Sequence, residues 1–254
     1  MIMKRQQFES TKGRPMYASR ITATGPGCHD DASPSPPGEH VTATFCFVDI
    51  AGYTALTDTH GEHAAADLVD TFTRVVRTAV VPHGRVHELT GDNAFLVFPD
   101  PRRAIDAIAQ LYRAVADLPD FPALRTGLHH GSALVRSSRY FGSTINLAAR
   151  TAAQAAGGEI LCTASVAGWL ANDPDPAFTL APVGKVKLKN LPRNVELHSV
   201  LLADVPHQRV VDPVCQMMVD TASAAAHRLF EGRHFWFCST GCAARFAAAP
   251  ADFL

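Results

Sequence analysis

Segments with the periods of strands and helices alternate through the middle of the chain, and their order constrains the fold more than any other feature of the sequence. Apolar residues recur every three or four positions in the helical segments, whereas the strand segments alternate or run apolar. The expected elements are strands at 41–50, 84–90, 93–98 and 123–135 and helices at 62–80 and 102–118. The order β-α-β-β-α-β predicts an α+β fold with a ferredoxin-like core and helices on one face of the sheet.

The rest of the chain extends this core and adds a second unit. A helix is expected at 143–155, a strand at 158–163 and a closing hairpin at 184–202. The first 40 residues are rich in Ser, Pro, Gly and charge and show no sustained period, which is typical of disorder. The 254 residues suffice for one sizeable domain and a small one. The predicted division is a disordered tail over 1–40, a globular domain over 41–202, a linker over 203–208 and a small domain over 209–254.

The charge balance gives no support for a nucleic-acid or membrane partner, because the formal net charge is only −1. No apolar run approaches the roughly 20 residues that a membrane-spanning helix needs. The N-terminus lacks the continuous apolar segment of a secretory signal. We therefore expect a cytoplasmic protein.

Three of the six cysteines lie close together near the C-terminus, at Cys215, Cys238 and Cys242. Cys46 and Cys162 lie in apolar strand segments and are expected in the core. In a reducing compartment a C-terminal group of this kind indicates a metal site rather than disulfides.

The spacing of the C-terminal cysteines favours a soft metal. Three residues separate Cys238 from Cys242 near an expected helix start, and Cys215 comes from a preceding strand or turn. Thiolates select ions such as Zn²⁺ or Cu⁺. The fourth ligand stays open among His227, His234 and solvent, and a buried thiol core without metal is the alternative.

Two aspartates stand where apolar strands meet turns, Asp49 after the first strand and Asp92 in the turn of the following hairpin. The expected topology places both strands in one sheet, so the two carboxylates can converge. Mg²⁺ or Mn²⁺ needs few protein carboxylates, because phosphate oxygens and water complete its coordination. Two such ions can activate an attacking oxygen and stabilise a leaving one. A pair of ordinary turn aspartates is the alternative.

Asn146 and Arg150 lie four residues apart in a helical segment and therefore share one face. An amide that holds a sugar oxygen and a guanidinium that offsets phosphate charge suit phosphoryl transfer, whose catalysis is mainly positioning and charge stabilisation. A solvated helix face is the alternative for such a pair.

Six ordered blocks between Val41 and Leu202 resemble the class III nucleotidyl cyclases. They are FVDIAGYT, ELTGDNAFLVF, LRTGLHHGSAL, YFGSTINLAAR, GGEILCT and KVKLKNLPRNVELHSV. The resemblance implies a homodimer whose active sites lie at the subunit interface and use residues of both chains. It also implies that Asp49 and Asp92 bind two Mg²⁺ or Mn²⁺ ions, with the carbonyl of Ile50 nearby.

The same resemblance assigns the remaining catalytic positions. Asn146 and Arg150 match the residues that position the ribose and stabilise the transition state. Lys189 falls near the phosphate-contacting lysine of the family, although Asn190 replaces the usual glycine after it. The implied reaction is attack of the ribose 3′-oxygen on the α-phosphorus of a purine nucleoside triphosphate, with pyrophosphate as the leaving group.

Glu88 and Arg139 both depart from the base-reading residues of adenylyl-type members. A carboxylate can accept from guanine N1–H and N2–H₂, and a guanidinium can donate to guanine O6 and N7. This chemistry favours GTP, whereas the family resemblance favours ATP, and we put ATP first. A third possibility is that Glu88 and Arg139 pair with each other and that the base is read loosely.

The C-terminal segment resembles the YHS domain, a cysteine module that handles metals. The resemblance rests on DPVC at 212–215, on FWFC and GC before the last helix, and on the terminal F-x₃-P-x₂-F pattern, with Gln216 in place of the usual glycine. Together the two resemblances imply a cytoplasmic nucleotide cyclase in intracellular signalling that a soft metal tunes. A purely structural zinc is the alternative for the metal, because zinc binding alone can fold so small a domain. The rival class is a catalytically silent dimer with the cyclase fold, although such a protein would not need Asp49, Asp92, Asn146 and Arg150.

Overall fold

The computed structural model describes residues 38–171, 173, 177–203 and 209–254. The predicted tail over 1–40 and linker over 203–208 fall outside these residues except at 38–40 and 203. The first strand, β1 (Glu39–Ile50), begins at Glu39 rather than at Val41. The domain division made from the sequence stays a prediction.

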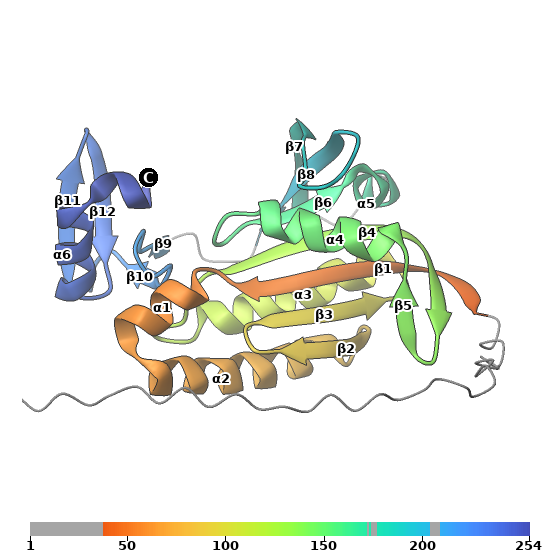
Figure 1. Ribbon diagram of the computed structural model, residues 1–254, viewed down its shortest axis with the longest axis horizontal. Helices are drawn as coiled ribbons and strands as arrows, with labels where there is room; N and C mark the ends of the chain where they lie inside the picture. The colour runs from red at the N-terminus through yellow and green to blue at the C-terminus, as the bar shows by residue number, and fades with distance from the viewer. Residues whose placement is uncertain (1–37, 172, 174–176, 204–208) are drawn as a thin grey trace, which may run out of the picture. The chain divides into compact units, whose positions relative to one another are not determined.

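In the described residues, an eight-stranded sheet has the order β2-β3-β1-β4-β6-β8-β7, with β5 paired to β4 (Figure 1). β1 runs antiparallel to both β3 and β4, and β6 runs parallel to β4. The first four strands of this order confirm the predicted ferredoxin-like arrangement. After β1, the strands are β2 (Arg85–Thr90), β3 (Asn93–Phe98), β4 (Leu124–Arg136), β5 (Arg139–Phe141), β6 (Ile160–Thr163), β7 (Phe178–Val186) and β8 (Val195–Leu202).

Helices cover both faces of this sheet, which corrects the expectation of one covered face. Alternate residues of β1 point to opposite sides: Cys46 and Val48 pack with the core under α2 and α3, whereas Phe45 packs with Ala148 of α4. The second face is apolar as well, so a helix has to cover it. The helices are α1 (Tyr53–His60), α2 (Glu62–Val80), α3 (Pro101–Ala116), α4 (Ser143–Gln154) and α5 (Ala164–Leu170).

Close packing of α4 on the sheet depends on Gly127 of β4. A β-carbon at Gly127 would lie 2.0 Å from the backbone nitrogen of Ala152, so a side chain larger than hydrogen would push the helix away. The sequence did not reveal α1, α5 and β5. The helices α1 and α5 have eight and seven residues, which is too short for a clear periodic signal.

The C-terminal segment, residues 209–254, belongs to the same compact unit as the core. Leu56 of α1 and Ala65 of α2 share one buried cluster with Val214, Phe237 and Phe246 of this segment.

None of the helices among the described residues, those of the C-terminal segment included, has the length and apolar content needed to cross a bilayer. The elements of the segment are β9 (Arg209–Val211), β10 (Met218–Asp220), β11 (Ala226–Phe230), β12 (Arg233–Phe237), α6 (Thr240–Ala248) and a 3₁₀ turn (Pro250–Phe253).

Candidate functional site

Asp49 lies at the end of β1, between two neighbouring strands. Its Cα is in register with Asn93 of β3 on one side and with Arg125 of β4 on the other. By the alternation of β1, its side chain points to the face that α4 covers. The side chain is buried, so its carboxylate needs a charged partner or a ligand.

Asp92 reaches the same edge through the turn between β2 and β3. Gly91 has φ +56°, a left-handed conformation that glycine adopts without strain. The Ile50 amide donates to the Asp92 carbonyl at 3.0 Å, which extends the β1–β3 ladder past Asp49. The structure therefore brings together the two aspartates that the sequence singled out.

The environment of Asp49 opposes its charge. Burial raises the pKa of the Asp49 carboxyl, Arg125 lowers it, and the nearby Asp92 carboxyl raises it again, with burial as the largest effect. A cation placed between the two carboxyl groups would offset both the cost of burying the Asp49 charge and the repulsion between the two carboxylates. The edge is thus suited to bind positive charge.

Arg125 was missed by the sequence analysis. Its Nε donates to Asp49 Oδ2 at 2.6 Å, and its Nη2 makes an ion pair with the same oxygen. The only signal for this contact is the strand register that places Arg125 opposite Asp49, and that register cannot be counted from one segment alone. Arg125 holds the Asp49 carboxylate in a fixed orientation.

Asn146 and Arg150 lie on α4 but away from its buried side, which is formed by Thr144, Ala148 and Thr151. Asn146 is exposed and Arg150 is partly exposed. Neither side chain makes a hydrogen bond or an ion pair with another residue in the described part of the chain. The fold of one chain therefore does not join them to Asp49 and Asp92 by any such contact.

Glu88 and Arg139 flank an aromatic contact without pairing with each other. The bulge at His87 in β2 places its ring 5.0 Å from the ring of Tyr140 in β5. Glu88 accepts a hydrogen bond from Thr90 Oγ1 at 3.1 Å and is exposed, as is Arg139. Among the described residues no ion pair links Glu88 to Arg139. The Glu88 carboxylate and the Arg139 guanidinium can therefore both contact a ligand.

Lys189 lies exposed in the turn between β7 and β8, next to the buried Leu188. Asn190 has φ +61°, a left-handed conformation that asparagine tolerates better than most residues other than glycine. This conformation explains how asparagine can stand where the resembling family usually has glycine. Leu188 packs the turn against the core, whereas the side chain of Lys189 is exposed to solvent.

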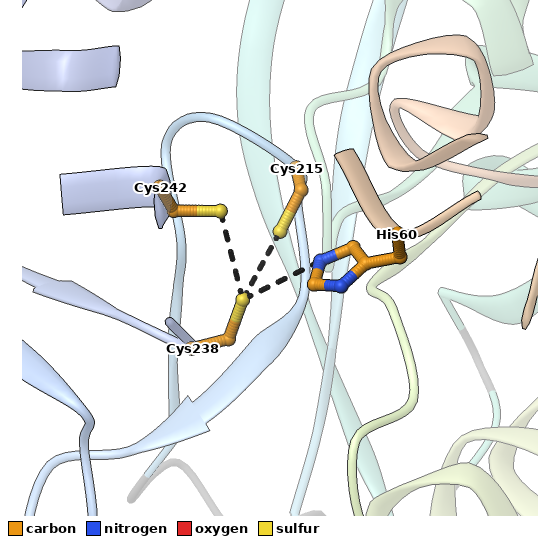
Figure 2. A group of neighbouring side chains, drawn as sticks. All are labelled: His60, Cys215, Cys238 and Cys242. Atoms are coloured by element: carbon orange, nitrogen blue, oxygen red, sulfur yellow. Dashed lines mark hydrogen bonds between the residues drawn. The ribbon is translucent and has the colours of Figure 1, made fainter. Parts of the chain in front are cut away.

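A second group of ligand atoms forms around the C-terminal cysteines. Figure 2 shows the side chains of Cys215, Cys238 and Cys242 converging with that of His60, the last residue of α1. The ligand atoms of the four residues all lie within 4.8 Å of one another. The three cysteines were predicted from the sequence, whereas His60 was not.

The protons of the three thiols are not equivalent. Hydrogen bonds from Cys215 and Cys238 lower the pKa of the Cys242 thiol to about 2, whereas the same interactions raise the pKa of Cys215. Cys242 also lies in the first turn of α6, where the helix dipole favours a thiolate. These interactions therefore favour the thiolate form of Cys242.

His227 and His234, the fourth ligands considered from the sequence, lie elsewhere. Both are exposed on β11 and β12, where His227 Nε2 is 2.7 Å from His234 Nδ1 and the rings stack at 4.9 Å. They belong to a surface pair and not to the ligand group of Figure 2.

Comparison with known proteins agrees with the geometry of the core. Residues 36–202 match the family described as adenylate and guanylate cyclase catalytic domain. An adenylate cyclase of Mycobacterium tuberculosis, described as pH-sensitive, is 29% identical over 168 residues, which are 66% of this chain and 42% of that protein. The chain therefore spans less than half of that relative's length.

Solved structures show the same fold at low identity. An adenylate cyclase of Trypanosoma brucei, solved in its monomeric state, gives a TM-score of 0.58 at 22% identity and covers 67% of this chain and 93% of its own. The adenylyl cyclase CyaB of P. aeruginosa gives 0.55 at 20% identity and covers 65% and 95%. These matches confirm the predicted α+β class.

Proposed function

This chain belongs to the family of adenylate and guanylate cyclase catalytic domains, and from that premise we propose that it converts a purine nucleoside triphosphate to the 3′,5′-cyclic monophosphate and pyrophosphate. The observation that carries the proposal is the meeting of Asp49 and Asp92 at one edge of the sheet. Their carboxyl groups come from separate segments, and the Asp92 carboxyl raises the pKa of Asp49. A pair of unrelated turn aspartates would not need to converge.

The donors at this edge fit hard divalent cations. The Asp49 and Asp92 carboxylates and the Ile50 carbonyl offer oxygen ligands, which Mg²⁺ and Mn²⁺ prefer. We assign two such ions to these three residues. When bound, they activate the attacking oxygen and neutralise charge on the triphosphate.

The other side chains position the reactants. In the proposed reaction the ribose 3′-oxygen loses its proton and bonds to the α-phosphorus, and the bond from that phosphorus to the bridging oxygen of pyrophosphate breaks. Asn146 holds the ribose, Arg150 offsets charge at the α-phosphoryl group, and Lys189 contacts a phosphate. Arg125 keeps the Asp49 carboxylate oriented through its ion pair.

The positions of Asn146, which is exposed, and Arg150, which is partly exposed, support a shared active site in a homodimer. One chain would supply Asp49 and Asp92, and its partner would supply the α4 residues across a two-fold interface. In this arrangement each dimer has two equivalent sites. In a single chain, no α4 residues of a partner face Asp49 and Asp92, so neither half-site is complete.

The base is assigned to ATP first, with guanylate cyclase activity as the alternative. Curated relatives named adenylate cyclase favour ATP. The Glu88 carboxylate and the Arg139 guanidinium, which do not pair with each other, favour GTP. Guanine offers two donors to a carboxylate and two acceptors to a guanidinium. The lack of an ion pair between Glu88 and Arg139 weighs against the third possibility, in which they occupy each other.

The product would act in intracellular signalling, and a soft metal at the C-terminal cysteines would adjust its formation. A silent dimer with a purely regulatory role is the competing function. The meeting of Asp49 and Asp92 argues against it, because two carboxyl groups of like charge placed side by side disfavour ionisation and have no purpose in an inert fold.

Incubation of the purified chain with Mn²⁺ or Mg²⁺ and either ATP or GTP tests the proposal. We expect a cyclic nucleotide and an equal amount of pyrophosphate, separated by chromatography, from at least one of the two substrates. The Asp92→Asn variant serves as the inactive reference. Absence of product from both nucleotides, in a sample whose dimer is demonstrated, would rule out the enzyme and favour the silent dimer.

A further inference from the structure

Four potential metal ligands from distant parts of the chain converge on one point. Cys215 lies in the turn between β9 and β10, Cys238 follows β12, Cys242 lies in the first turn of α6, and His60 ends α1. We propose that these three thiolates and the His60 imidazole bind one Zn²⁺ ion in a tetrahedral site that fastens the C-terminal segment to α1 of the core.

The distances from Cys238 to the other three ligand atoms match such a site. Zn–S bonds of about 2.3 Å and Zn–N bonds of about 2.0–2.1 Å give tetrahedral edges of roughly 3.8 Å between sulfurs and roughly 3.6 Å between sulfur and nitrogen. Cys238 Sγ lies 3.4 Å from Cys215 Sγ, 3.7 Å from Cys242 Sγ and 3.6 Å from His60 Nε2 (Figure 2). Three thiolates and one imidazole form a known composition of structural zinc sites.

Backbone contacts hold the cysteines in place independently of a metal. The buried carboxylate of Asp212 accepts from the amides of Val214 and Cys238 at 2.9 and 2.8 Å. Ser239 caps α6 and accepts from the Cys242 amide at 3.1 Å. Gln216 closes the turn after Cys215 with φ +62°. The thiols are thus preorganised, which lowers the cost of binding an ion.

His60 is also held by packing rather than by chance proximity. Leu56, one turn before it in α1, is fully buried among Val214, Phe237 and Phe246 of the C-terminal segment. Thr59, its neighbour, accepts a hydrogen bond from Arg245 of α6. The α1 helix therefore presents His60 to the cysteines in a fixed place.

A disulfide accounts for the group less well. The separation of 3.4 Å between Cys215 and Cys238 far exceeds the S–S bond length of about 2.05 Å. A disulfide would also use two of the four ligand atoms and leave an imidazole and a thiol turned inward without a role. A buried thiol core would not require His60.

The site lies next to the carboxylate edge. Gly52 follows Asp49 by three positions, and a β-carbon there would lie 2.6 Å from Cγ of Gln216. Ala123 bridges the two regions, since its amide donates to the Gln216 carbonyl at 2.9 Å and its carbonyl accepts from the Ala51 amide at 2.9 Å. A consequence that rests on the proposed function is that zinc stiffens the loop after Asp49 and so affects turnover.

The zinc site itself can be tested without any turnover measurement. The full chain is freed of metal under reducing conditions and titrated with Co²⁺ and then with Zn²⁺. We expect one ion per chain, a cobalt spectrum with thiolate charge-transfer bands and tetrahedral ligand-field bands, and displacement of Co²⁺ by Zn²⁺. X-ray absorption of the zinc-loaded wild type should give three sulfur ligands and one imidazole nitrogen.

Variants identify the fourth ligand. His60→Ala should weaken zinc binding by more than the roughly 10–100-fold that loss of an outer-shell partner costs, whereas His60→Cys should restore it with a fourth thiolate in the cobalt spectrum. His63→Ala, an exposed neighbour on α2, and His227→Ala should bind like the wild type. Unchanged affinity in His60→Ala, loss in His227→Ala, or absorption data without an imidazole would overturn the site.

Discussion

The cysteine group and the carboxylate edge differ in how far one chain completes them. The cysteine group collects four ligand atoms within 4.8 Å from α1 and three C-terminal elements. The carboxylate edge collects Asp49, Asp92 and Arg125, but the side chains of Asn146 and Arg150 make no hydrogen bond or ion pair with other described residues. Folding of one chain finishes the first group and leaves the second without half of its proposed machinery.

This difference has a structural cause in α4. The helix uses its small residues Ala148 and Ala152 to approach the sheet closely at Gly127. Asn146 and Arg150 are thereby turned away from the sheet, where a second chain can contact them. We therefore expect zinc binding to be a property of each chain and turnover to be a property of the dimer.

The largest expected effect separates the two regions. Asp49→Ala should lower turnover on the order of 10²–10³-fold or more, because it removes a carboxylate that would hold the metal ions that neutralise charge on the triphosphate. Zinc content per chain should stay that of the wild type. Asp67→Ala, an exposed carboxylate on α2, is the matched control. Substantial turnover in Asp49→Ala would refute its assignment as a metal ligand.

Mixing two inactive variants tests the sharing of the carboxylate edge. Asp49→Ala and Arg150→Ala lesions fall on opposite halves of each proposed site, so a heterodimer keeps one intact site out of two. Random exchange of equal amounts should restore about a quarter of wild-type turnover. If subunit exchange is demonstrated, for example by mass spectrometry of tagged chains, and turnover stays at zero, the site is not shared.

A smaller effect is expected at the base. Glu88→Lys should shift the ratio of ATP to GTP turnover toward ATP by roughly tenfold. The change replaces a carboxylate that can accept hydrogen bonds from guanine with a cation that cannot. Glu231→Lys, the same change in the exposed turn between β11 and β12, should leave the ratio as it is. An equal ratio in both variants and the wild type would remove Glu88 from the base pocket.

The smallest effect concerns β4, which carries Arg125 to the carboxylate edge. Burial, followed by the nearby His130, lowers the pKa of His129 from 6.5 to about 4. As the pH falls, His129 therefore binds a proton near pH 6.5 in the unfolded chain but only near pH 4 in the folded chain. The free energy of unfolding consequently decreases as the pH falls through this range. Urea unfolding at several pH values should show this loss diminished in His129→Gln and retained in His63→Gln; equal slopes would contradict it.

The fold and the carboxylate pair could be predicted because their signals are local. Period and order located β1 to β4, and Asp49 and Asp92 each follow an apolar strand into a turn. The second covered face was missed, although Ala43 and Phe45 already alternate with Cys46 and Val48. Those alternating positions form a second apolar surface that requires cover.

The contacts that were missed depend on register and on distance along the chain. Arg125 meets Asp49 only through the pairing of β1 with β4. His60 lies far from the cysteines in sequence and ends a helix too short to show a period. The glycine replacements Asn190 and Gln216 were noticed in the sequence, but only their positive φ angles explain them.

A dilution series on the wild-type chain tests the central contrast most directly. Turnover per chain, zinc per chain and the fraction of dimer by sedimentation are measured on the same samples. We predict that turnover per chain falls in proportion to the dimer fraction while zinc stays at one ion per chain. Turnover per chain that stays constant where the protein has become monomeric would contradict the account.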